Sequence, residues 1–303
     1  MQARIGLPQG LLYYQYGTVW ERFFREIGAE VVVSGETSRQ TMDCGSALDE
    51  VCLPAKVYYG HAVSLYSEVD YLFVPRIISV HKQQYTCPKI IGMPDMLRTN
   101  IGQLPPLIDV SVNLRQSSRD LYRAVTTVGR MVGKNALTSL RAWYRAWHSR
   151  DGANGCSPAG DGRTPVALIG HPYLIYDRQI SMNIMAKMQQ MGLTVLTPEM
   201  VDTKTADRAA AVLGKKIFWS GSHHLAGAAL ALMTASRPVK GVVFMTCFAC
   251  GPDALIGELI AQRASALNIP CMNLSIDEHT AEAGFITRLE AFSDMLTRRW
   301  RPC

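Results

Sequence analysis

The sequence predicts an α/β protein made of two Rossmann-like domains, each with a doubly wound and mainly parallel sheet, joined by a helical connection. Three observations lead to this fold class. Short apolar runs alternate with longer amphipathic stretches along the chain. The 303 residues suffice for two domains of roughly 100–200 residues each. A glycine-rich stretch without large apolar side chains, residues 151–163, separates two halves that show the same alternation.

Residues 1–150 are expected to form an N-terminal α/β domain that ends in closing helices. Its opening has the pattern of a β-α-β unit, because large apolar side chains recur at helical spacing between two short apolar runs. The expected elements are strands at 4–7, 30–33, 71–74 and 89–92, a helix at 13–27, and one or two helices at 117–147.

Residues 151–163 (DGANGCSPAGDGR) are expected to be a flexible linker, and residues 164–303 a C-terminal α/β domain. The expected elements of this second domain are strands at 166–169, 194–196, 241–245 and 271–276, and helices at 176–191, 206–213, 222–235, 253–267 and 283–296. In such sheets, ligands bind beyond the carboxyl ends of the strands.

The overall charge and hydropathy exclude several classes of protein. The 31 Lys and Arg residues exceed the 25 Asp and Glu residues by only six, unlike the concentrated basic face of a nucleic-acid binder. The longest apolar candidate, LAGAALALM, has about half the length that a membrane span needs. The first residues, MQARIGLPQG, show no secretory signal. These features predict a cytoplasmic protein that binds neither nucleic acid nor membrane.

The eight cysteines are the most informative residues, because in a reducing cytoplasm they persist as thiols, metal ligands or catalytic groups. Cys52, Cys87 and Cys250 stand in loops beside prolines, and such turns hold a side chain at a loop tip with backbone N–H groups close to the sulfur. Of the remaining cysteines, three have a simple structural or incidental explanation and a fourth is undecided. Cys271 begins an apolar strand, Cys156 lies in the linker, Cys303 ends the chain, and Cys44 is ambiguous.

Three kinds of thiol chemistry fit these loops. Structural zinc normally shows two tight cysteine pairs, whereas Cys247 and Cys250 form the single CxxC of the chain. A redox dithiol needs that pair at a helix N-terminus, which is where the CGPD turn is expected, so it stays an alternative. An iron–sulfur cluster held by widely separated loop cysteines fits better, because thiolates are its usual ligands.

Six motifs occur in order between Ile5 and Phe292. They are GLPQGLLYYQYGTVWERFFREIGAEVVVS, DEVCLPAKVYYGH, VDYLFVPRIISV followed by YTCPKIIGMPDM, GHPYLIYD, ACGPDA and IDEHTAEAGFITRLEAF. Together they resemble the activase-associated branch of the 2-hydroxyacyl-CoA dehydratase and benzoyl-CoA reductase superfamily, which includes the double-cubane cluster proteins. The resemblance covers nearly the whole chain.

The resemblance implies an oxygen-sensitive iron–sulfur cluster between two Rossmann-like domains, either 4Fe-4S or a double-cubane 8Fe-9S. Its ligands would be Cys52 in the ExCLPxK motif, Cys87 in YxCPK and Cys250 in the CGPD turn. A double cubane needs about six thiolates, and six cysteines remain after Cys156 and Cys303 are set aside. The resemblance also implies an ATP-hydrolysing activase as partner, and a homodimer or a pairing with a related subunit.

Lys56 and His61 are the candidate catalytic residues, because they follow Cys52 by four and nine positions. On a helix, Lys56 would face the same side as the ligand and would donate hydrogen bonds to cluster sulfide or to substrate. The alternative for Lys56 is a solvated side chain. His171, in GHPY, falls at the carboxyl end of a predicted strand, where a structural histidine is an equal alternative.

The chain has neither a GxxxxGK[ST] phosphate loop nor a GxGxxG fingerprint, so ATP hydrolysis and dinucleotide binding are not supported. The leading hypothesis is an iron–sulfur oxidoreductase or a 2-hydroxyacyl-CoA dehydratase-like component. It would accept low-potential electrons from a separate activase and deliver them to a small substrate. The alternative is a non-catalytic iron–sulfur carrier or scaffold subunit of a CoA-enzyme complex. The sequence leaves the substrate open, including whether it is a CoA thioester.

Overall fold

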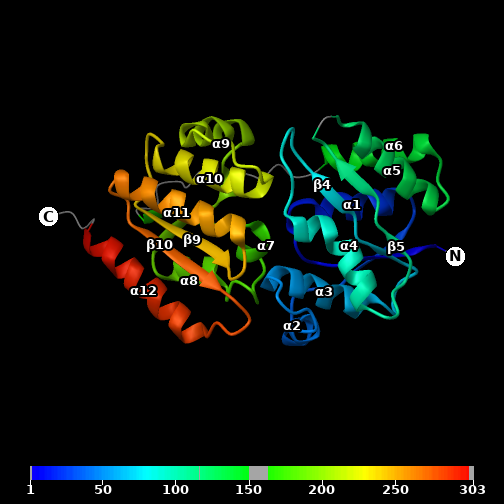
Figure 1. Cartoon of the computed structure of the whole chain (residues 1–303), viewed down its shortest axis with the longest axis horizontal. Helices are drawn as coiled ribbons and strands as arrows, with labels where there is room; N and C mark the ends of the chain where they lie inside the picture. Colours follow the sequence, from blue (N-terminus) through cyan, green and yellow to red (C-terminus); the bar gives the residue numbers. More distant parts are fainter. Residues whose placement is uncertain (1, 116, 150–162, 300–303) are drawn as a thin grey trace. The chain divides into compact units, whose positions relative to one another are not determined.

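Two parallel sheets form the framework of the chain in the computed structural model, which describes residues 2–115, 117–149 and 163–299. The chain divides into two compact units. The first comprises Met1–Gly152 together with Phe218–Ser220, and the second comprises Ala153–Ile217 and Gly221–Cys303. The sheets are flanked by helices (Figure 1), so the predicted α/β class with Rossmann-like parallel sheets is confirmed. Most of the predicted linker, residues 151–162, lies outside the described residues, as do Cys156 and Cys303.

The sheet of the first unit has the strand order β2-β1-β3-β5, and every pair in it is parallel. β1 therefore pairs with β2 on one side and with β3 on the other, so the order reverses between β1 and β3. The elements are β1 (Arg4–Leu7), α1 (Tyr13–Glu26), β2 (Glu30–Val33), α2 (Arg39–Gly45), α3 (Leu53–Leu65), β3 (Tyr71–Phe73), β4 (Arg76–Ser79), α4 (Pro88–Asn100), β5 (Leu107–Ile108), β6 (Ser111–Asn113), α5 (Arg119–Met131) and α6 (Ala136–His148).

An aromatic core fixes α1, α5 and α6 against the sheet of the first unit. Trp20 of α1 packs against Phe73 of β3, with ring centroids 4.6 Å apart, and against Trp143 of α6 at 4.8 Å. Phe23 and Phe24 beside it are fully buried. Aromatic side chains bury large areas, and this periodic set is what made the first helix readable from the sequence.

The second unit repeats the topology with the strand order β10-β9-β7-β8, again all parallel. Its order reverses between β7 and β9. Its helices and strands are β7 (Thr164–Ile169), α7 (Pro172–Ile175), α8 (Ile184–Gln190), β8 (Leu193–Leu196), α9 (Thr203–Ala210), α10 (Ser220–Met233), β9 (Gly241–Cys247), α11 (Gly251–Ala266), β10 (Cys271–Ile276) and α12 (Glu282–Arg299), with short 3-10 turns at Pro198–Met200 and Ala211–Leu213.

Helices cover both faces of this second sheet. Val242 and Phe244 of β9 pack on one face against α10 and α11, which lie together on one side of the strands in Figure 1. A side chain at Gly241, which alternates with them, would meet Leu296 and Phe292 of α12 on the opposite face. Strand side chains alternate between the two faces, and both faces are covered by helices. β9 is therefore buried on both sides, and its sequence is a nearly continuous apolar run.

Two sequence-based assignments are wrong. Residues 89–92 are not a strand but part of α4, because Cys87 caps this helix and Pro88 supplies a first residue whose φ is already helical. A short apolar run such as KIIG fits either structure. The helix expected at 176–191 begins only at Ile184, since Met182 and Asn183 have positive φ angles of 49° and 56°. Among the described residues, no helix is long and apolar enough to cross a membrane.

Candidate functional site

Cys52, Cys87 and Cys250 share one local structure: each is the N-cap residue of a helix that has a proline in its first turn. The helices are α3, α4 and α11, and each thiol is partly exposed and in no disulfide. A helix N-terminus leaves backbone N–H groups without helical partners and has a partial positive charge, which stabilises a thiolate. The three sequence-predicted cysteines therefore share one backbone position, the N-terminal end of a helix.

The fold accounts for the position of Cys250. β7 and β9 are adjacent parallel strands, and the strand order of the second unit reverses between them. His171 follows the carboxyl end of β7, and Cys250 follows the carboxyl end of β9. The turn before Cys250 contains Ala249 with a φ of 66°, an uncommon conformation for a residue with a side chain. Both residues thus lie at the point where open α/β sheets bind ligands.

A buried carboxylate organises this edge of the second unit. Asp253, in the first turn of α11, is 1% exposed. Its Oδ1 accepts a hydrogen bond from Ser222 Oγ at 3.0 Å, and its Oδ2 lies 3.1 Å from His171 Nε2. The Cys250 thiol also hydrogen-bonds this carboxylate. His171 in turn stacks on Tyr173, with ring centroids 4.9 Å apart and an angle of 14° between the planes.

The pKa shifts in this cluster follow from a charged pair held out of water. Burial alone would lower the pKa of His171, but the charge of Asp253, the hydrogen bond to it and the nearby Cys250 and Glu199 together raise it above its ordinary value. Burial alone would raise the pKa of Asp253, but the charge of His171 and hydrogen bonds from His171, Ser222 and Cys250 lower it. The pairing therefore favours the imidazolium form of His171 and the carboxylate form of Asp253.

A glycine is needed for this arrangement. A Cβ on Gly221, in the first turn of α10, would stand 2.6 Å from Cε1 of the His171 ring. Cβ atoms in folded proteins essentially never come this close to a non-bonded atom, so any other residue here would force the imidazole to move. The sequence pattern predicts His171 at this edge but does not indicate that Asp253 and Ser222 join it. An acidic residue three positions after an N-cap cysteine is the signal that identifies Asp253.

The two candidate catalytic residues lie on α3, after Cys52. His61 is fully buried, and its two ring nitrogens each lie 2.9 Å from a hydroxyl, that of Ser34 and that of Thr37. It thereby ties the segment after β2 to α3. Lys56 is half-buried, one helical turn after Cys52, and its backbone N–H donates to the Cys52 carbonyl at 3.2 Å. The predicted helical spacing between Cys52 and Lys56 is therefore present.

The remaining described cysteines differ in environment. Burial raises the pKa of the Cys271 thiol to about 11, and its side chain packs on the apolar core of the second unit. Cys247 is buried at the end of β9, and Cys44 lies on α2. The pKa of Tyr59 on α3 is raised mainly by burial and, to a smaller extent, by the electrostatic effect of the nearby Cys44. Within the described part of the chain, no three His, Cys, Asp or Glu side chains gather closely enough to hold a metal ion.

The fold and these side chains define a class of protein: two parallel α/β units that present cysteines at helix N-termini and an imidazole-carboxylate pair at a strand edge. The chain belongs to the family described as the CoA enzyme activase uncharacterised domain (DUF2229), whose model matches residues 4–201. The match includes Cys52, Cys87 and His171 but ends before Cys250. At the level of this family, the resemblance to activase-associated proteins of CoA enzymes is confirmed. No curated protein matches the chain significantly.

Proposed function

We propose that the chain is an iron–sulfur component of a CoA-enzyme system, of the kind found in the activase-associated branch that includes the double-cubane proteins. It receives low-potential electrons from a separate ATP-hydrolysing activase and uses them to reduce or dehydrate a small substrate. One observation carries the proposal: Cys52, Cys87 and Cys250, far apart in the sequence, are all N-cap residues of helices that have a proline in the first turn. Membership of the CoA enzyme activase family supports the partner system.

The residues present fit a thiolate-bound cluster. Soft thiolate sulfur is the preferred ligand of iron–sulfur clusters. Each N-cap also brings backbone N–H groups near the sulfur, and hydrogen bonds of this kind tune the potential of a cluster. Either a 4Fe-4S or a double-cubane 8Fe-9S cluster is compatible with this donor chemistry. The cluster, when bound, supplies electrons at low potential.

The side chains around the cysteines have separate roles in this proposal. Asp253 holds the imidazole of His171, whose positive charge when protonated lies close to Cys250 and offsets negative charge on a cluster bound at this sulfur. Lys56 follows Cys52 on the same helix face and neutralises negative charge near that thiolate. His61 holds α3 in place through Ser34 and Thr37.

The test is the iron and acid-labile sulfide content of anaerobically purified and reconstituted protein. We expect charge-transfer absorption in the wild type, and loss of most iron and sulfide in Cys52→Ser, Cys87→Ser and Cys250→Ser. The matched control is Cys271→Ser, because burial raises the pKa of the Cys271 thiol to about 11. The protein with this substitution should keep its iron. Wild-type protein without iron, sulfide and charge-transfer absorption overturns the proposal. Bound zinc in its place identifies a zinc protein.

Turnover separates the enzyme from a carrier. Activase, ATP and a reductant should reduce the cluster, and the true substrate should then accelerate its reoxidation. If reduction proceeds but no candidate substrate accelerates reoxidation, while an acceptor protein does, the chain is a carrier or scaffold subunit. The two results distinguish an enzyme from a carrier, because an enzyme's cluster must be reoxidised by the substrate itself.

A further inference from the structure

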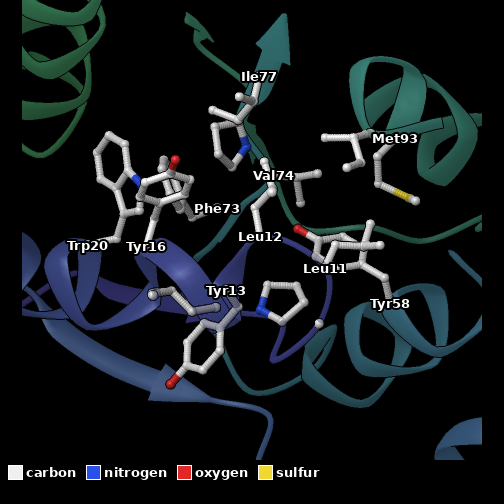
Figure 2. A pocket seen from close by; sticks show the side chains of 16 residues that line it. Leu11, Leu12, Tyr13, Tyr16, Trp20, Tyr58, Phe73, Val74, Ile77 and Met93 are labelled. Atoms are coloured by element: carbon white, nitrogen blue, oxygen red, sulfur yellow. The ribbon is translucent and has the colours of Figure 1, made fainter. Parts of the chain in front are cut away.

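The first unit contains an apolar pocket at the carboxyl ends of β1 and β3, where its strand order reverses. The lining side chains come from the turn after β1, from α1, α3 and α4, and from the segment that follows β3 (Figure 2). The space not filled by atoms, including the opening to solvent, measures about 570 Å³. None of the lining residues is charged. A concave site with such an apolar lining suits a small molecule rather than an ion.

A single tyrosine hydroxyl is left without a partner at this pocket. Tyr58 of α3 is 8% exposed, and its hydroxyl makes no hydrogen bond among the described residues. Burial raises its pKa above the ordinary value, so the hydroxyl keeps its proton. In Figure 2 the Tyr58 side chain extends from α3 toward Leu12 and Val74 at the middle of the pocket. The hydroxyl of Tyr13, by contrast, donates to Glu21 at 2.6 Å.

The turn after β1 is shaped around Tyr58. A Cβ on Gly10 would lie 3.2 Å from the Tyr58 ring and 3.4 Å from its Cα, so the turn packs directly on this residue. The next residue, Leu11, is buried and has a φ of 49°, a rare conformation for a bulky residue. Such strained conformations cluster at ligand sites, where the surrounding structure holds them in place.

We propose that this pocket binds a small uncharged molecule that has an apolar body and one hydrogen-bond acceptor, and that Tyr58 donates its hydroxyl proton to that acceptor. An aryl or branched-alkyl ketone or ester has this chemistry. An ionised carboxylate does not, because its charge would be buried among side chains that offer no counter-charge. The inference is independent of the iron–sulfur proposal, since none of the residues that carry it is a proposed cluster ligand.

Three probes of similar shape test the proposal by calorimetric titration of the metal-free protein. Butyrophenone has the acceptor, butylbenzene lacks it, and 4-phenylbutyrate replaces it with a charge. We expect the ketone to bind more tightly than the hydrocarbon, and the carboxylate to bind most weakly. Failure of the ketone to bind, or binding of the carboxylate with equal affinity, overturns the proposal.

The variant Tyr58→Phe isolates the hydroxyl. It should weaken ketone binding about 5–10-fold, as expected for one lost hydrogen bond, and leave hydrocarbon binding unchanged. The matched control is Tyr122→Phe, which removes a hydroxyl from a residue that is 51% exposed on α5. A second variant, Leu12→Trp, fills the pocket and should abolish binding of both neutral probes. Equal loss of both probes in Tyr58→Phe, or unchanged binding in a folded Leu12→Trp, contradicts the assignment.

Discussion

Removal of the Asp253 carboxylate tests whether the His171 pair organises the edge of the second sheet. In Asp253→Ala, the imidazolium of His171 and the hydroxyl of Ser222 lose their buried partner. Breaking a buried pair in this way costs about 3–5 kcal/mol. Asp253→Asn keeps the shape and the acceptor for Ser222 and should cost about 1–3 kcal/mol. In thermal unfolding of the metal-free protein, the alanine variant should lose about 10 °C.

The pH dependence of this prediction follows from the two shifts. The folded pKa of His171 is raised, so the stabilisation is complete below the unfolded value of 6.5 and is lost as the pH rises through the folded pKa. The folded pKa of Asp253 is lowered, so its contribution is present above the unfolded value of 3.8 and is lost as the pH falls through the folded pKa. The pair therefore stabilises the fold most between about pH 4 and 6.5.

Nuclear magnetic resonance titration of the imidazole completes the test. In the wild type, the pKa of His171 should lie above 6.5; in Asp253→Asn it should fall below 6.5, because burial then acts without the opposing charge. The control is Asp207→Asn, which alters a carboxylate that contacts His223 and whose side chain is 58% exposed, and should change stability little. A pKa above 6.5 in Asp253→Asn, or an unchanged melting temperature in Asp253→Ala, would refute the reasoning.

Two further predictions concern the packing of α3, the helix that carries Cys52. Gly60→Ala should destabilise the first unit by about 1–3 kcal/mol in chemical denaturation, because the new Cβ overlaps the backbone carbonyl of Thr41 on α2. The control Gly92→Ala, in open space on α4, should stabilise it by about 0.5–1 kcal/mol, and equal effects would contradict the close approach. His61→Ala should cost about 2–4 kcal/mol, because the fully buried imidazole is lost and two partly buried hydroxyls lose their partner. Unchanged stability with lost turnover would instead make His61 catalytic.

The order of strands and helices could be predicted from the sequence where apolar residues formed a continuous run or recurred at helical spacing. The first helix and the strand at Gly241–Cys247 are such cases, because their burial leaves an unambiguous pattern. β4 was missed because Pro75 has no N–H to donate and interrupts the run that continues from β3 into Arg76–Ser79. Local backbone chemistry, rather than hydropathy, decides such cases.

The candidate site was predictable only in part, for a related reason. Cys52, Cys87 and Cys250 could be selected because proline beside cysteine is a local signal. The partners of Asp253 come from 31 and 82 positions away, and a polar residue near a turn is usually solvated. Its burial depends on which loops the sheet order brings together. Tyr58 was missed for the same reason, since a tyrosine in an apolar helix gives no sign that its hydroxyl lacks a partner.

The two units show how one topology supports different chemistry. In each, the first strand is central, the second strand lies on one side of it and the third on the other, so the loops after the first and third strands meet at the same edge. In the first unit, these loops contribute apolar side chains, and the result is a pocket that favours neutral molecules. In the second unit, they contribute His171 and Cys250, and Asp253 follows in the next helical turn. Both edges contain a non-glycine residue with positive φ, Leu11 in one and Ala249 in the other. Because the backbone arrangement is common to both, the side chains in these few loop positions, and not the sheets, determine what each unit can bind.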